Sequence, residues 1–274
     1  MGAITFRVKT GLVFAILMLC HTHPAHAQSV WTPPDLTNAV TVEILRPSFD
    51  NDEALKFPTA AVFLTLRHRA TFYVHLVFEL PLVYAKYDAY LGGTESDTVL
   101  GNPYFGFEIR SEDSPFFGEV GVRPPIAGEK HYQAQSIGIF SGYIQRMGAH
   151  WPKSFWFKGA FNYLAEAASG LKIRLRSGFS MSIPDKLNPE MFLLYSGYLS
   201  QSLDKVLLWG GFSGSMLMTG EGLDMGERVM HEMGLGASLN LSRVQPGIII
   251  RLPLDEDLSD WLHNVIGICV TVKL

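Results

Sequence analysis

Residues 171–183 read LKIRLRSGFSMSI, and their side chains alternate between apolar and polar along almost the whole stretch. The odd positions are apolar apart from Ser177, and the even positions begin with three cations, Lys172, Arg174 and Arg176. A period of two places successive side chains on opposite faces of a β-strand. A strand with one wet and one apolar face fits either a soluble sandwich or a barrel that stands in lipid.

Repeated alternation along the chain behind an export signal favours the barrel. Arg7 and Lys9 precede an apolar core, and Ala25-His26-Ala27 supplies an A-x-A cleavage site before Gln28. We therefore expect residues 1–27 to be a secretory signal peptide and residues 28–274 to form one outer-membrane β-barrel domain.

Two alternatives to this interpretation are less favoured. A lipoprotein anchored through Cys20 is the less favoured one, because bulky Leu19 stands where lipoprotein processing usually has a small residue. A helical membrane protein is disfavoured too, because no later apolar run is long enough to span a bilayer as a helix.

Alternation recurs along the mature chain and predicts a twelve-stranded antiparallel transmembrane β-barrel with short periplasmic turns and long extracellular loops. An even strand number leaves both termini in the periplasm of a Gram-negative bacterium. The faces of the strands near 190–199 and 205–217 stay unassigned, because both of their sides are apolar and rich in glycine. The expected strands lie near 40–45, 59–67, 72–80, 104–110, 116–123, 153–163, 171–183, 190–199, 205–217, 228–240, 248–252 and 266–274.

The connections between these strands alternate in length, as the barrel requires. Those on the predicted outer side include 48–58, 82–101 and 124–152, whereas those on the other side are short. We expect 82–101 to be a long loop. Within 124–152, residues 135–150 are predicted to form a short helix over or inside the barrel mouth.

Charged residues fall on the face predicted to point into the lumen. One hypothesis is a narrow conduit whose cationic wall favours anionic or carboxylated solutes by focusing the electric field. The alternative is an ion network that plugs a small barrel, because buried charges need partners. The predicted pore-lining residues are Glu79, Glu108, Glu119, Lys158, Lys172, Arg174, Arg176, Glu232 and Arg251.

Composition disfavours several other functions. Removing Arg7 and Lys9 with the signal leaves 20 of the 22 Lys and Arg against 26 Asp and Glu, without the basic face that nucleic acid requires. No His/Cys/Asp cluster has metal-ligand spacing, so neither a metal nor a cofactor is expected. The expected partners are outer-membrane lipid and a small-molecule solute.

An outer-membrane lipid hydrolase is the rival enzyme class, and it would need a nucleophile or water held by an oriented base. His231-Glu232 is the nearest candidate, but adjacent residues on a strand point to opposite faces and cannot form one site. We therefore expect no catalytic residues and no enzyme. A structural or surface-binding role for a plugged barrel stays open.

Three short motifs carry a family resemblance. They are Glu79-Leu80-Pro81, Gly101-Asn102-Pro103-Tyr104 and Arg251-Leu252-Pro253-Leu254-Asp255. Their arrangement resembles the transporter-like outer-membrane barrels linked to the meta-pathway of phenol degradation. The resemblance implies an outer-membrane location and passage of small molecules, and it carries over no catalytic residues. The chain departs from many such barrels by ending in Leu274 in place of Phe or Trp.

Overall fold

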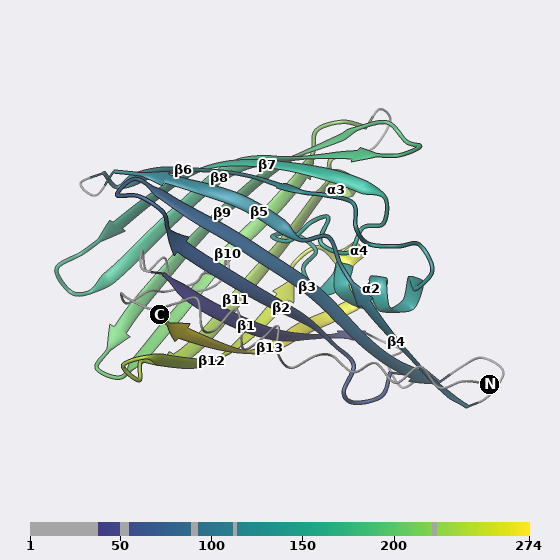
Figure 1. Ribbon diagram of the computed structural model, residues 1–274, viewed down its shortest axis with the longest axis horizontal. Helices are drawn as coiled ribbons and strands as arrows, with labels where there is room; N and C mark the ends of the chain where they lie inside the picture. Colours follow the sequence, from purple (N-terminus) through teal and green to yellow (C-terminus); the bar gives the residue numbers. More distant parts are fainter. Residues whose placement is uncertain (1–37, 50–54, 89–92, 112–113, 221–223) are drawn as a thin grey trace.

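A computed structural model describes residues 38–49, 55–88, 93–111, 114–220 and 224–274, which form a tilted barrel of long strands (Figure 1). The predicted signal peptide, 1–27, lies outside the described residues. The strands are β1 (Ala39–Phe49), β2 (Ala60–Arg69), β3 (Val74–Asp88), β4 (Thr94–Leu100), β5 (Tyr104–Arg110), β6 (Phe116–Arg123), β7 (Ser154–Glu166), β8 (Leu171–Pro184), β9 (Glu190–Leu203), β10 (Val206–Leu217), β11 (Val229–Leu239), β12 (Val244–Pro253) and β13 (Leu262–Lys273). The helices are α2 (Tyr132–Ser141), α3 (Met225–Arg228) and α4 (Glu256–Ser259).

The sheet closes on itself, and every pairing in it is antiparallel. The first strand pairs with the last from Ala39 opposite Lys273 onward, and β2 pairs with β3 to complete the ring. β4 and β5 share one position in the wall, because β5 pairs with the first half of β3 and β4 with its second half. The thirteen strands therefore make the twelve-stranded barrel that the alternation predicts.

The expected long loop at 82–101 is wrong. β3 continues to Asp88, and β4 pairs with it from Leu100 opposite Leu82 to Thr94 opposite Asp88. This hairpin extends the wall beyond its neighbours and carries the polar sequence TESDTVL, which lacks the apolar face of a lipid-exposed strand. A search for alternating hydrophobicity misses such a strand, because most side chains on both of its faces are polar.

Inward and outward faces differ strongly in polarity. Leu175 is 52% exposed on the outer side of β8, whereas its neighbour Arg174 is 4% exposed on the lumen side. The structure also assigns the two faces that alternation left open. Ser196 and Ser200 of β9, and Ser213 of β10, are buried on the lumen side.

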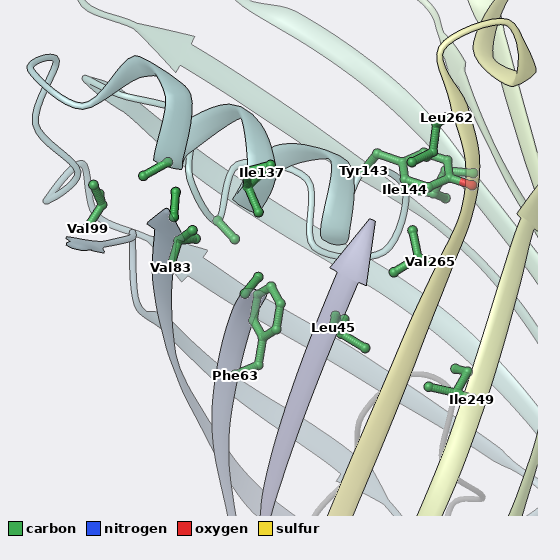
Figure 2. Packing of buried hydrophobic residues seen from close by; sticks show 14 of the residues in the cluster. Leu45, Phe63, Val83, Val99, Ile137, Tyr143, Ile144, Ile249, Leu262 and Val265 are labelled. Carbon is green, nitrogen blue, oxygen red and sulfur yellow. The ribbon is translucent and has the colours of Figure 1, made fainter. Parts of the chain in front are cut away.

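The connection between β6 and β7 folds into the barrel mouth. A short helix does form here, but it spans Tyr132–Ser141, so the predicted range 135–150 is wrong at its C-terminal end, where turns and bends continue to His150. Residues 132–150 are called the plug from here on. Ile137 and Ile144 of the plug pack with Phe63 and Val83 of the wall in one buried cluster (Figure 2). Among the described residues, no helix has both the length and the apolar character needed to cross a membrane.

Candidate functional site in the plugged lumen

The lumen holds a set of buried ion pairs that join strands of the barrel wall. Glu108 of β5 pairs with Arg67 of β2 across β3, and Arg251 of β12 lies 3.4 Å from Glu232 of β11. These charges lie inside because lumen-facing positions alternate with lipid-facing ones, and each carboxylate needs a partner once water is limited.

Arg176 of β8 binds Glu119 of β6. Its Nη2 donates to Glu119 Oε2 at 2.7 Å, and Tyr104 donates its hydroxyl to the other oxygen of Glu119 at 3.2 Å. β5, β6 and β8 therefore meet at one carboxylate inside the barrel.

Arg146 attaches the plug to the barrel wall. Its Nε donates to Glu79 Oε2 at 2.7 Å, and its Nη2 donates to Glu43. Its guanidinium also lies over the Phe63 ring at 4.1 Å from the centroid. Glu79 takes a second arginine, Arg123, at 2.7 Å. The plug is thus held by an ion network that spans β1, β3 and β6.

The wall also donates to backbone carbonyls of the plug. Arg251 Nη2 donates to the Ser141 carbonyl, and Lys158 Nζ donates to the Gln145 carbonyl at 3.1 Å. The last residue of α2 and the turn that follows it are therefore each bound by a side chain of the wall, one from β12 and one from β7.

Asn102 joins the two ends of the long β6–β7 connection. Its Oδ1 accepts from the backbone N–H groups of Ile126 and Ala127, each at 2.7 Å. Its Nδ2 donates to the carbonyls of Gly148 and Trp151 at 2.8 and 2.7 Å. This fully buried amide belongs to the Gly101–Tyr104 motif and interrupts the wall between β4 and β5.

Close packing holds the end of the plug against the wall. Gly148 has a φ of +84°, and a Cβ at this position would lie 2.5 Å from the Trp156 ring. Both requirements favour glycine, which adopts positive φ without a steric penalty and lets the backbone approach the indole.

His150 is the last residue of the plug, and it is buried. Neither of its ring nitrogens has a hydrogen-bond partner among the described residues. It packs edge-on against Phe63 at 5.8 Å between centroids. Burial, assisted by the nearby Arg123 and Arg146, lowers the pKa of His150 from 6.5 to about 3, against an opposing effect of Glu79. The imidazole is therefore neutral while the plug is docked.

The structure places the predicted pore-lining residues on lumen-facing positions, but in two groups. Seven lie in or beside the buried ion network, and they are Glu79, Glu108, Glu119, Arg174, Arg176, Glu232 and Arg251. Lys158 faces the plug, whereas Lys172 lies at the short-turn end of β8, one-third exposed and 3.4 Å from Glu166.

Sequence reasoning missed Arg146 and Asn102, which both help to hold the plug. Arg146 lies in a segment without clean alternation, so no period indicated which way it points. Asn102 lies in a motif that carried the family resemblance, but its four bonds reach residues up to 49 positions away. Only the folded connection brings those partners together.

His231 and Glu232 do point to opposite sides, as the alternation requires. Glu232 is fully buried beside Arg251, whereas His231 faces outward, where its Nδ1 lies 2.7 Å from Asp255 Oδ1 and its Nε2 lies 2.6 Å from the Tyr195 hydroxyl. Within the described part of the chain, no group of three His, Cys, Asp or Glu residues is arranged to hold a metal ion.

The fold places the chain among β-barrels of the outer-membrane type. An outer membrane channel from Pseudomonas putida F1 is similar with a TM-score of 0.58 at 8% identity, over 92% of this chain and 97% of that chain. The NanC porin is similar with a TM-score of 0.53 at 8% identity, over 86% of this chain and 100% of that chain. At this identity, the likeness shows the fold alone. No protein-family model and no curated protein matches the chain.

Proposed function

We propose that this chain is an outer-membrane channel for small solutes and that the plug closes its path in the described state. The observation that carries the proposal is a closed barrel with an apolar outer face and a charged lumen, into which one outer connection folds. A barrel with a purely structural role could fill its interior with apolar side chains, which would avoid the cost of desolvating so many charges.

The way in which the plug is held supports a closed but reversible state. Arg146 is bound to Glu43 and Glu79 by charge-assisted hydrogen bonds, and the loop ends are bound through Asn102. These contacts use side chains of the wall and not its strand pairing, so the plug can leave without breaking the sheet, although Ile137 and Ile144 must then separate from Phe63 and Val83. An open barrel would expose Arg174 and Arg176 to the path and would favour anionic solutes.

The family resemblance in the three short motifs agrees with this proposal. It suggests that the solute is a small organic molecule, as in the barrels linked to phenol degradation. The two similar solved structures are named as a channel and a porin, which supports passage of solutes across the outer membrane as the function to test.

Single-channel recording in a planar bilayer tests the proposal. We compare the refolded mature protein with a variant in which residues 128–150 are replaced by a short Gly/Ser linker. The variant should give stable conductance steps and the parent mostly closed traces. Reversal potentials in a salt gradient should show anion preference, which Arg174→Ala with Arg176→Ala should reduce. A variant that inserts as a folded barrel and stays silent would remove the channel function.

One observation favours a second function, hydrolysis of lipid at the outer surface. Asp255 holds the ring of His231 through Nδ1, which is how a general base is oriented, and the Tyr195 hydroxyl lies against the other nitrogen. Fatty acid released from phospholipid vesicles by the refolded protein, and lost in His231→Asn, would support this function. If the parent protein releases no fatty acid from the vesicles, this function is excluded.

A further inference from the structure

A small cavity of about 50 Å³ remains in the lumen between the plug and strands β2, β3 and β5 to β8. Gln145 and Arg146 of the plug form one side of it. Five cationic and three acidic side chains line it, so the lining carries an excess of positive charge. This cavity lies inside the barrel and has no assigned ligand.

Each carboxylate around the cavity already has an arginine. Glu79 is bound by Arg123 and Arg146, and Glu119 is bound by Arg176. Glu108 is bound by Arg67. Among the described residues, none of these acids forms a salt bridge with Lys158 or Arg174, although Glu119 lies close enough to both to interact with them electrostatically.

Two lining cations have only neutral hydrogen-bond partners among the described residues. Arg174 donates from Nε and Nη2 to Asn162 Oδ1, at 3.1 and 2.8 Å, and its Nη1 has no acceptor. Lys158 donates to the Gln145 carbonyl. Arg174 is 4% exposed and lies over the Phe117 ring, 5.5 Å from its centroid. Arg176 also has a free donor, since its Nε has no acceptor in the described part of the chain.

A buried cation without a counter-ion is unfavourable. We propose that the cavity binds one small monovalent anion, chloride or a carboxylate group, between Lys158 and Arg174. The donors left free on Arg174 and Arg176 supply its hydrogen bonds. A water molecule needs about 10–15 Å³ of such space, so the cavity admits an ion of a few heavy atoms and excludes a large one.

Anion binding is coupled to the plug, because Gln145 and Arg146 form part of the cavity. The site exists only while the plug is docked, so the anion stabilises the closed form. The site does not depend on whether the barrel conducts, and its test uses no conductance.

Thermal unfolding of the refolded mature protein in detergent micelles tests the site. Sodium chloride and sodium formate are compared with sodium gluconate at equal ionic strength, since gluconate is too large for the cavity. Chloride and formate should each raise the Tm by several degrees and reach saturation, whereas gluconate should not. The salt that saturates at lower concentration identifies the preferred anion. Equal Tm values in all three salts would overturn the proposal.

Variants separate the site from a general salt effect. Arg174→Met and Lys158→Met should each abolish the chloride-dependent rise in Tm, measured for each variant against its own Tm in gluconate, because each removes one of the two cations that bind the anion. Lys205→Met, in an exposed turn, should keep the full rise. A rise that persists in Arg174→Met would overturn the proposal.

A second measurement needs no variant. Crystals of the parent protein grown in sodium bromide should show an anomalous peak within the cavity. Density for water alone at that position would equally overturn the proposal.

Discussion

Arg146 is the residue on which the closed state depends most. It is the plug side chain that reaches both Glu43 and Glu79, and all three groups are buried. Removing one partner of a buried ion pair leaves an uncompensated charge, which costs about 3–5 kcal/mol. Arg146→Gln should therefore release the plug and raise the open fraction in single-channel recordings.

Lys153→Gln is the matched control for Arg146→Gln. Lys153 pairs with Glu129 at 2.7 Å near the same connection, but both side chains are about half exposed. Exposed pairs contribute about 0–1 kcal/mol, so this change should leave the open fraction as in the parent. Equal effects of the two changes would contradict the role of Arg146.

His150 makes docking of the plug dependent on pH. The pKa of His150 is about 3 in the docked plug and 6.5 for the free side chain, so the docked state binds the proton more weakly than the undocked state. Docking is most stable above pH 6.5 and weakens as the pH falls toward 3, by about 1.4 kcal/mol per pH unit. The charged groups around the ring are Glu79, Arg123 and Arg146.

Proteolysis of the plug at pH 7 and at pH 5.5 measures this effect, because carboxylates ordinarily titrate below that range. Cleavage should be faster at pH 5.5 in the parent, and His150→Phe should reduce the difference. Equal cleavage of the parent at both values, with a protease whose activity is matched, would show that His150 does not control docking.

At the level of elements, Asn102 connects the wall to both ends of the β6–β7 connection. Its amide makes four hydrogen bonds to backbone groups, and a buried group left without its partner costs about 1–3 kcal/mol. Asn102→Ala should make the connection sensitive to protease while the barrel keeps its heat-resistant mobility in gels. Asn240→Ala, an exposed residue near a short turn, is the control and should leave cleavage unchanged.

The extension of β3 and β4 is explained at this level too. Val83 and Ala85 are fully buried because the plug packs against the inner side of β3, whereas most of β4 is exposed. The hairpin therefore has one covered face and gains its stability from the plug. When a distant loop covers a strand, the strand need not show the alternation of apolar and polar residues by which a sequence predicts it.

At the level of the whole molecule, the outer face is set by the bilayer. Leu175 is exposed on that face, and an arginine near the midplane costs about 2–4 kcal/mol. Leu175→Arg should lower the free energy of unfolding in lipid vesicles by that amount. Leu203→Arg, at the short-turn end of β9, should cost about 0–1 kcal/mol, because the penalty falls toward the interface. Equal losses of unfolding free energy in the two variants would show that Leu175 does not face the lipid near the midplane.

The sequence by itself determined the closed barrel, the inward and outward faces of most strands and the set of charges in the lumen. These follow from a local rule, since a strand alternates with period two and the two solvents on its sides select opposite residue types. The tertiary structure alone decided the pairing of those charges, the attachment of the plug through Arg146 and Asn102, and the cavity in which five cations meet three carboxylates. These features depend on contacts between residues far apart in the chain. The alternation of apolar and polar residues along a strand does not indicate how a loop folds back into the space that the strands enclose.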